Sequence, residues 1–297
     1  MDYKIIDIDI EDVSISTRLN ELLGQVFGNT SDALPHDKLK NNTTTKGSNK
    51  SLYLAAIENE EIIGFTAFIS HTLFLNNQSI NCYQICWVAT HSEHRGKKTF
   101  QNLVEEAKKI LQDRGAGFIF GFPNNMSQPI FLHKLGFKEI PSLKLNIPNS
   151  VFLKNLFFNK NIDGASKLNS NSILQNEKEL YELKKIEYGS HLIESHLNGS
   201  KIWGTIRHKI LKGIKISYFD IGGIEIQNMA DISVLFQKIS NSNKFSFFQI
   251  VSTENNSYNQ IFKRLKPART NDLIVFDLNL DTTSLNFNFF GGIKDVW

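Results

Sequence analysis

The stretch from Cys82 to Leu111 constrains the fold of this chain more than any other. Its first part, residues 82–88, is an apolar run rich in residues that favour strands. Its last part, residues 100–111, carries apolar side chains at helical spacing, and Arg95 and Gly96 lie between the two. The pattern predicts a strand that passes through a turn into a helix, which begins at about Lys98.

The turn between this strand and this helix favours an anion as its ligand. The first N–H groups of a helix have no acceptor inside the helix, and they coincide with the positive end of the helix dipole. Arg95, Lys97 and Lys98 add positive charge at the same place. We therefore expect phosphate or pyrophosphate to bind there.

Residues 88–100, with the sequence VATHSEHRGKKTF, resemble the coenzyme A turn of the GNAT superfamily of acyl-CoA-dependent N-acyltransferases. The resemblance implies that a backbone N–H of Val88 or Ala89 stabilises the thioester carbonyl oxygen. Lys98 stands where the motif has its second glycine, and Phe100 where a small residue is usual. We expect Lys98 to follow the helical path and to add a cation. The implied coenzyme site comprises Val88, Ala89, Arg95, Gly96, Lys97, Lys98, Thr99 and Phe100.

A second segment, residues 117–137 with the sequence GFIFGFPNNMSQPIFLHKLGF, resembles the next GNAT motif. That motif is a splayed strand, an Asn-x-x-Ser turn, a short helix and a final Leu-Gly-Phe. Asn124 and Ser127 fit the turn and join the implied coenzyme site, and Gly136 follows the helix. Splayed strands leave backbone groups that need partners, and in the family the pantetheine arm supplies them. The two motifs span residues 50–140 and imply acetyl-CoA as co-substrate.

The resemblance implies an α/β (α+β) fold with a mixed, mostly antiparallel sheet and helices on both faces. Residues 141–175 contain two prolines and many Asn and Ser, which indicates a boundary. We predict a catalytic domain at 1–145, a linker at 146–175 and a second GNAT-like α/β domain at 176–297. The second domain lacks an Arg-Gly turn, and its end, FFGGIKDVW, resembles degenerate second copies in the family. Its predicted elements are a hairpin around Gly222-Gly223, helices at 232–239 and 258–265, and strands at 245–251 and 272–278.

Three further segments give local predictions. Residues 10–27 predict an amphipathic helix that Gly28 ends, and residues 52–57 and 62–75 predict strands joined at Asn59-Glu60. The polar residues 29–50 are a substrate lid or a solvated loop. Residues 201–212 mix cations with Trp203. Either they form a surface that contacts a phosphorylated or nucleotide-linked acceptor, or they form an amphipathic helix that its lysines keep soluble.

Transfer of an acyl group from a thioester to an amine needs a base for the amine and an acid for the thiolate. The candidate bases are His91 and Glu93, with His71 and Glu58 as further candidates. The tyrosine that usually acts as the acid is replaced by Leu132. Three residues of the polar loop are candidates for contact with a cationic acceptor: Asp32, His36 and Asp37.

These features predict an N-acetyltransferase acting on a primary amine of a small molecule, with an amino sugar as one candidate. The alternative is a catalytically silent protein that binds acyl-CoA, or that keeps only the fold, and acts as a regulatory partner.

Composition restricts the class of protein further. The 297 residues carry 33 basic and 30 acidic side chains, a net charge of +3, which does not indicate a nucleic-acid partner. No run approaches the roughly 20 apolar residues of a membrane span, and the N-terminus is unlike a secretory signal, so we expect a cytoplasmic protein without a membrane partner. Cys82 and Cys86 would lie about 13 Å apart along one strand, too far for a disulfide. No residue pattern predicts a metal site.

Overall fold

The computed structural model describes residues 3–28, 49–150, 172–175, 177–228, 230–256, 259, 266–270 and 272–290. The chain divides into two compact units. The first comprises residues 1–73, 79–139 and 274–283, and the second comprises residues 74–78, 140–273 and 284–297. Each unit contains a sheet with helices packed against it, and each is described by itself below.

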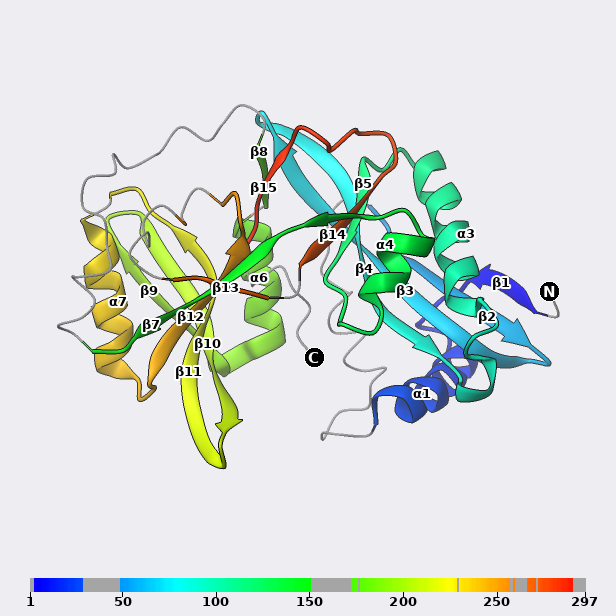
Figure 1. Ribbon diagram of the computed structural model, residues 1–297, viewed down its shortest axis with the longest axis horizontal. Coiled ribbons are helices and arrows are strands. Elements are labelled where there is room, and N and C mark those ends of the chain that lie inside the picture. The colour runs from blue at the N-terminus through cyan, green and yellow to red at the C-terminus, as the bar shows by residue number, and fades with distance from the viewer. Residues whose placement is uncertain are drawn as a thin grey trace. The chain divides into compact units, whose positions relative to one another are not determined.

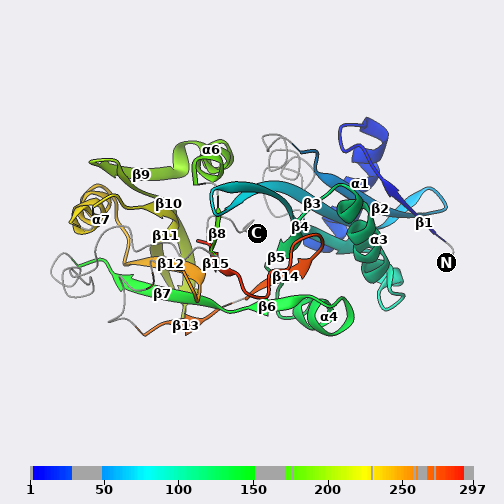
Figure 2. The same cartoon turned by 90° about the horizontal axis from the view of Figure 1, so that it is seen from above.

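The sheet of the first unit has the strand order β1-β2-β3-β4-β5-β14-β6 (Figures 1 and 2). Strand β4 is parallel to β5, whereas β2 is antiparallel to β1 and β3, and β14 is antiparallel to β5. The strands are β1 (Lys4–Asp7), β2 (Leu52–Glu58), β3 (Glu61–Leu75), β4 (Gln78–Thr90), β5 (Phe118–Gly121), β6 (Lys138–Ile140) and β14 (Leu273–Asp277). The helices are α1 (Val13–Phe27), the short 3-10 helix η1 (Ser92–His94), α3 (Thr99–Asp113) and α4 (Gln128–Lys134). This mixed sheet confirms the fold class predicted from the sequence.

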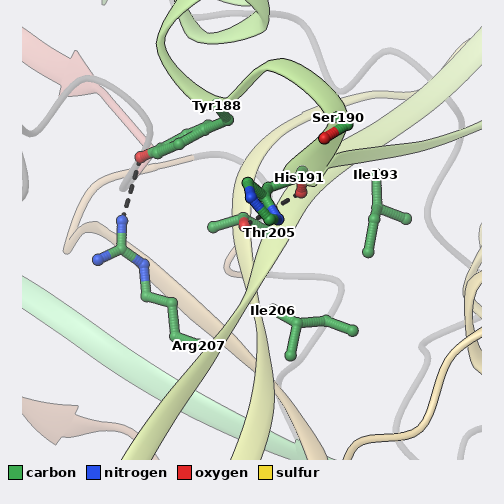
Figure 3. Close-up of a pocket in the computed structure, with 7 residues that line it drawn as sticks. All are labelled: Tyr188, Ser190, His191, Ile193, Thr205, Ile206 and Arg207. Atoms are coloured by element: carbon green, nitrogen blue, oxygen red, sulfur yellow. Dashed lines mark hydrogen bonds between the residues drawn. The ribbon is translucent and has the colours of Figure 1, made fainter. Parts of the chain in front are cut away.

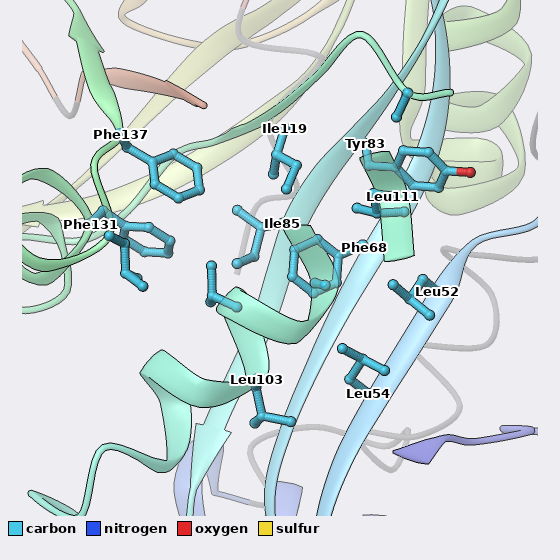
Figure 4. Close-up of a cluster of buried hydrophobic side chains, with 14 of the residues drawn as sticks. Leu52, Leu54, Phe68, Tyr83, Ile85, Leu103, Leu111, Ile119, Phe131 and Phe137 are labelled. Atoms are coloured by element: carbon cyan, nitrogen blue, oxygen red, sulfur yellow. The ribbon is translucent and has the colours of Figure 1, made fainter. Parts of the chain in front are cut away.

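Helices α1 and α3 cover opposite faces of this sheet because successive strand residues point to opposite faces. On β2, Leu52 and Leu54 pack in one cluster with Leu103 and Leu111 of α3, as Figure 4 shows. The intervening residues of β2 pack in a second cluster with Leu19, Leu22 and Leu23 of α1. On β4, Tyr83 and Ile85 belong to the α3-side cluster, whereas Cys86, Trp87 and Ala89 belong to the α1-side cluster.

Local sequence signals set the ends of these elements. The Asp12 side chain accepts hydrogen bonds from the N–H groups of Ser14 (2.8 Å) and Ile15 (3.3 Å), which caps α1. Gly28 follows the helix with a φ of +76°. Asn59 and Glu60 both have positive φ and join β2 to β3. The predicted helix and the predicted pair of strands are confirmed.

The sheet of the second unit has the strand order β13-β7-β12-β11-β10-β9. Strand β11 is parallel to β12, and the other described pairs of this sheet are antiparallel. The strands are β7 (Ser142–Pro148), β9 (Leu192–Leu197), β10 (Ser200–Leu211), β11 (Ile214–Glu225), β12 (Phe247–Thr253) and β13 (Ala268–Arg269). The helices are α6 (Glu177–Tyr188), the 3-10 helix η2 (Gly189–His191) and α7 (Asp231–Ser242). Two further strands, β8 (Ser172–Gln175) and β15 (Asn286–Asn288), pair in parallel.

Two predictions for this unit are wrong. The segment 201–212 is not a helix, since it lies in β10. Residues 222 and 223 are not a hairpin turn, because β11 continues through them and pairs with β10. A Cβ at Gly222 would overlap the ring of the buried Trp203, so glycine is needed there for close packing. The predicted helix at 232–239 and strand at 245–251 are confirmed as α7 and β12.

The second unit repeats the strand arrangement of the first. In the first, β2, β3 and β4 form an antiparallel series, α3 follows, and β5 lies parallel to β4. In the second, β9, β10 and β11 are followed by α7 and by β12, which lies parallel to β11. This arrangement is consistent with the second α/β domain predicted from the sequence, although the strand predicted at 272–278 is β14, which pairs with β5 in the first sheet.

The compact units do not coincide with the boundary at residue 145 that the sequence suggested. Strand β7 pairs with β12, and β14, from the C-terminal part of the chain, pairs with β5. Each sheet is therefore completed by a strand distant in sequence. Most of the predicted linker, the helix at 258–265 and the last seven residues lie outside the described residues.

None of the described helices combines the length and the apolar character that crossing a membrane requires.

Candidate functional site

The candidate site begins where β4 and β5 part. Their parallel pairing covers Tyr83 to Ile85 on β4 and Ile119 to Gly121 on β5, yet β4 continues to Thr90. Gly121 allows the close approach at the last pair, because a Cβ there would lie 2.7 Å from Ile85 Cγ2. Beyond this point no described strand pairs with the β5 edge of β4, which could pair with a ligand.

The backbone of β4 directs N–H groups into this gap. The N–H of His91 donates to Ile63 O on β3, at 2.9 Å. Backbone groups along a strand alternate between its two neighbours. The N–H groups of Thr90 and Val88 are therefore directed toward the β5 edge. Of the two residues suggested for carbonyl binding, this geometry favours Val88 over Ala89.

Trp87 adds an unusual backbone conformation at the same place. Its φ is +52°, inside β4 and two residues after the pairing with β5 ends. A bulky residue in the left-handed region costs free energy, and such residues concentrate at functional sites. The kink lies directly before Val88.

The Arg-Gly turn follows η1 and presents a series of backbone N–H groups. Gly96 has a φ of +78°, and a Cβ placed on it would meet nothing within 4 Å, so its backbone faces open space. The first bond of α3 runs from Asn102 N–H to Lys98 O, at 2.9 Å. Within the part of the chain that the structure describes, the N–H groups that precede this bond and lack an acceptor are those of Gly96, Lys98, Thr99, Phe100 and Gln101. Such a cradle at a helix N-terminus fits a pyrophosphate.

Lys98 does not follow the helical path, so that prediction is wrong. Its φ of +62° and ψ of 12° place it in the left-handed region, and α3 begins at Thr99. The turn keeps the conformation that glycine prefers at this position and imposes it on lysine. The side chain of Phe100 packs on Phe131 with ring centroids 5.2 Å apart, which leaves its N–H as the group available to a ligand.

The second motif forms a capped turn before α4. Asn124 Oδ1 accepts from the N–H groups of Met126 (3.0 Å) and Ser127 (2.9 Å) and from Ser127 Oγ (3.1 Å). Gly136 follows the helix with a φ of +69°. Asn124 and Ser127 thus fix the chain after β5, and their contact with the coenzyme stays a prediction.

The candidate bases occupy different surroundings. His91 caps η1 by accepting from the N–H of Glu93 at 3.4 Å, and Glu93 is exposed. Glu58 Oε2 lies 3.7 Å from His94 Nε2. His71 packs its ring on Phe120 at 5.4 Å. His94 brings two of these candidates together, because it contacts Glu58 and its ring centroid lies 5.8 Å from that of His91. The polar-loop candidates Asp32, His36 and Asp37 lie outside the described residues.

Gln84 is a candidate that the sequence analysis did not identify. It lies on β4 one residue before the pairing with β5 ends, and it is 2% exposed. Its neighbours Tyr83 and Ile85 belong to the α3 cluster, so Gln84 points to the α1 face. Its Oε1 has no hydrogen-bond partner among the residues that the structure describes. The signal was present in the sequence, since Gln84 is the one polar side chain other than the Tyr83 hydroxyl and the cysteines in residues 82–88.

The second unit contains a cavity of about 420 Å³ between the end of α6, η2, β9 and β10 (Figure 3). Arg207 is its charged lining residue. Arg207 donates to Tyr188 Oη at 3.1 Å, and its Nε lies 3.0 Å from Asp220 Oδ2, although that N–H is not aligned on the oxygen. Burial raises the pKa of Tyr188, which keeps this hydroxyl protonated. No residue of the two sequence motifs lines this cavity.

The start of α7 corresponds in the repeated topology to the start of α3, but it carries an acid instead of cations. Asp231 is buried, and its carboxylate accepts from Ser200 Oγ (3.0 Å) and Asn198 Nδ2 (3.2 Å). A buried carboxylate in the first turn occupies the place where the helix dipole favours an anion, and it repels a phosphate. Within the part of the second unit that the structure describes, the start of α7 therefore does not offer the arrangement found at the start of α3.

Residues 14–140 match the family model of the acetyltransferase (GNAT) domain. This match identifies a GNAT acetyltransferase domain in the first part of the chain, as the two motifs indicated. A comparison with curated proteins finds no significant match.

Three solved structures illustrate the similarity of fold. A GCN5-related N-acetyltransferase from Kribbella flavida has a TM-score of 0.67 at 10% identity, covering 94% of this chain and 72% of that one. A probable N-acyltransferase of unknown function from Enterococcus faecalis V583 has a TM-score of 0.63 at 11% identity, covering 95% and 74%. Eis1 from Mycobacterium abscessus has a TM-score of 0.59 at 8% identity, covering 93% and 73%. At these identities the likeness shows the fold, and it extends over both units.

Proposed function

We propose that this protein transfers an acetyl group from acetyl-CoA to a primary amine of a small molecule. The observation that carries the proposal is the set of backbone N–H groups at the Arg-Gly turn, next to a gap between parallel strands. The family and the fold support acyl transfer in general. The acetyl donor, the amine and the amino sugar as one candidate acceptor are our proposals.

In this proposal the pyrophosphate of the coenzyme binds the N–H group of Gly96 and those from Lys98 to Gln101, with the side chains of Arg95 and Lys97 as nearby cations. The pantetheine arm lies along the β5 edge of β4 and pairs with backbone groups that β5 leaves open. The thioester oxygen then accepts from the N–H of Val88. Such a donor, fixed before the reaction, stabilises the negative charge that develops on this oxygen.

The reaction requires two proton transfers. The amine nitrogen attacks the thioester carbon, a C–N bond forms, and the C–S bond breaks when the tetrahedral intermediate collapses. The nitrogen loses a proton to a base or to water, and the sulfur leaves as a thiolate that takes up a proton. We propose that Gln84 Oε1 accepts an N–H of the amine and orients it, since this oxygen is buried and unpartnered.

A screen for acetyl transfer tests the proposal. The purified chain is incubated with acetyl-CoA and a panel of primary amines that includes amino sugars, and both thiol release and acetylated product are measured. We expect thiol release that depends on one class of amine. The control variant Lys109→Ala removes a cation that is 72% exposed and lies elsewhere on α3, and it should behave as the native chain.

The alternative is a protein that binds acyl-CoA without transferring the acyl group. Leu132 at the usual position of the acid is the observation that favours it, because its side chain packs against the core and has no proton to give. Coenzyme binding without acetylated product from any amine would support this alternative and refute the enzyme.

A further inference from the structure

The β10–β11 hairpin extends beyond the sheet of the second unit. Strand β9 pairs with β10 only as far as Thr205, and β12 pairs with β11 only from Tyr218. Among the described residues, 209–211 and 214–216 therefore pair only with each other, around Lys212 and Gly213, since Ser217 O also accepts from the N–H of Ser246. Figure 1 shows this two-stranded ribbon reaching past its neighbouring strands.

The end of the ribbon exposes three large aliphatic side chains. Ile210 is 78% exposed, Ile214 is 67% exposed and Leu211 is 53% exposed. Burying side chains of this size would be favourable in free energy, so their exposure to water is unfavourable. Contiguous exposed apolar groups of this kind mark an interaction site.

The aliphatic side chains lie on both faces of the ribbon. Leu211 is opposite Ile214, while Ile210 is opposite Lys215, so the two pairs point to opposite faces. A protein partner that covers one face would leave part of this apolar surface in water. A medium that surrounds the end of the ribbon would cover all of it.

The charges around these side chains have one sign. Residues 206–217 contain Arg207, Lys209, Lys212 and Lys215 and no acidic residue. Arg207 pairs with Asp220, and the Lys209 ammonium lies 4.6 Å from the ring centroid of Phe247. Lys212 and Lys215 are exposed, and no ion pair of the described residues involves them. Two free cations therefore flank the aliphatic end.

We propose that this ribbon docks the protein on the surface of an anionic lipid bilayer. Ile210, Leu211 and Ile214 enter the boundary between headgroups and acyl chains, and Lys212 and Lys215 contact lipid phosphates. This interaction is peripheral and reversible. It differs from the expectation from the sequence that the protein has no membrane partner, and it does not depend on the proposed acetyl transfer.

Sedimentation with vesicles tests this proposal on the full chain. Vesicles of phosphatidylcholine alone are compared with vesicles of phosphatidylcholine and phosphatidylglycerol in equal amounts. We expect binding to the anionic vesicles that falls with added salt, and far weaker binding to the neutral ones. Each lysine at an anionic surface contributes about a fivefold factor, so Lys212→Gln with Lys215→Gln should weaken partitioning roughly 25-fold.

A variant with Ile210→Ser, Leu211→Ser and Ile214→Ser should lose binding to both kinds of vesicle. Ile186→Ser is the matched control, because Ile186 is 58% exposed on α6 of the same unit. This control variant should bind vesicles as the native chain does. Circular dichroism checks that all variants are folded. Failure of the native chain to bind anionic vesicles, or unchanged binding by the triple serine variant, would overturn the proposal. A dimer in solution that the triple variant dissociates would instead assign the ribbon to a second copy of the chain.

Discussion

Gln84→Met should make the protein more stable and less active. The native side chain places an amide oxygen in a core position that is 2% exposed, and no described residue offers this oxygen a hydrogen bond. An unsatisfied buried polar group costs about 1–3 kcal/mol. Methionine has nearly the same length and volume and no group that requires a hydrogen bond. The free energy of unfolding should therefore rise by about 1–3 kcal/mol.

The assay for stability is thermal unfolding followed by circular dichroism, with Gln249→Met as the matched control. Gln249 is half-buried, and its Nε2 donates to Asp220 at 3.2 Å, so the same substitution there removes a hydrogen bond that is present. This control should unfold at a lower temperature than the native chain, whereas Gln84→Met should unfold at a higher one.

The assay for function is the rate of acetyl transfer at saturating acetyl-CoA. Gln84→Met should lower kcat with the amine acceptor and leave the KM for acetyl-CoA unchanged, because Gln84 is assigned to the amine. A loss of stability like that of Gln249→Met would mean that the Gln84 amide is satisfied in the fold. A kcat equal to that of the native chain would remove Gln84 from the site.

Two further predictions concern the turn and the first helix. Lys98→Gly should be more stable than Lys97→Gly by about 1 kcal/mol in urea unfolding, because both variants lose one cation but only Lys98 has a positive φ; equal stabilities would contradict the left-handed turn. The hydroxyl and N–H of Ser14 hold the pKa of Asp12 below its ordinary value. The stability that this carboxylate provides is present above its unfolded pKa of about 4 and is lost as the pH falls through the lower folded pKa. Asp12→Asn keeps the helix cap without this titration, so its urea midpoint should fall less than that of the native chain between neutral pH and about pH 3; equal falls would refute the role of Asp12.

The sequence predicted correctly those elements whose ends are set by residues close to them in the chain. Helix α1 has its cap at Asp12 and its glycine at position 28, and the Asn59-Glu60 turn joins two strands of the expected lengths. Both signals act over a few residues, so they can be read without knowledge of the partner strands. The Arg-Gly turn is also predictable from nearby residues, because the first N–H groups of any helix lack an acceptor inside the helix.

The incorrect predictions depend on contacts between residues distant in sequence. Residues 201–212 contain apolar residues that fit a helix as well as a strand, and pairing with β9 and β11 decides in favour of the strand. The Gly222-Gly223 pair is typical of a turn, but in the structure Gly222 lies in a strand and its lack of a side chain leaves space for the ring of Trp203. The conformation of Lys98 is imposed by the turn against the propensity of lysine, and the burial of Gln84 requires the whole sheet.

The most direct test of the account is calorimetric titration of the native chain and of Arg95→Ala with acetyl-CoA and with free CoA. The structure predicts one site per chain, because Asp231 occupies the equivalent position in the second unit. A charge-assisted hydrogen bond from Arg95 to the pyrophosphate would contribute about 1.5–3 kcal/mol, so the variant should bind both ligands roughly 10- to 150-fold more weakly. Absence of binding by the native chain, or equal affinity in the variant, would contradict the placement of the coenzyme at the Arg-Gly turn.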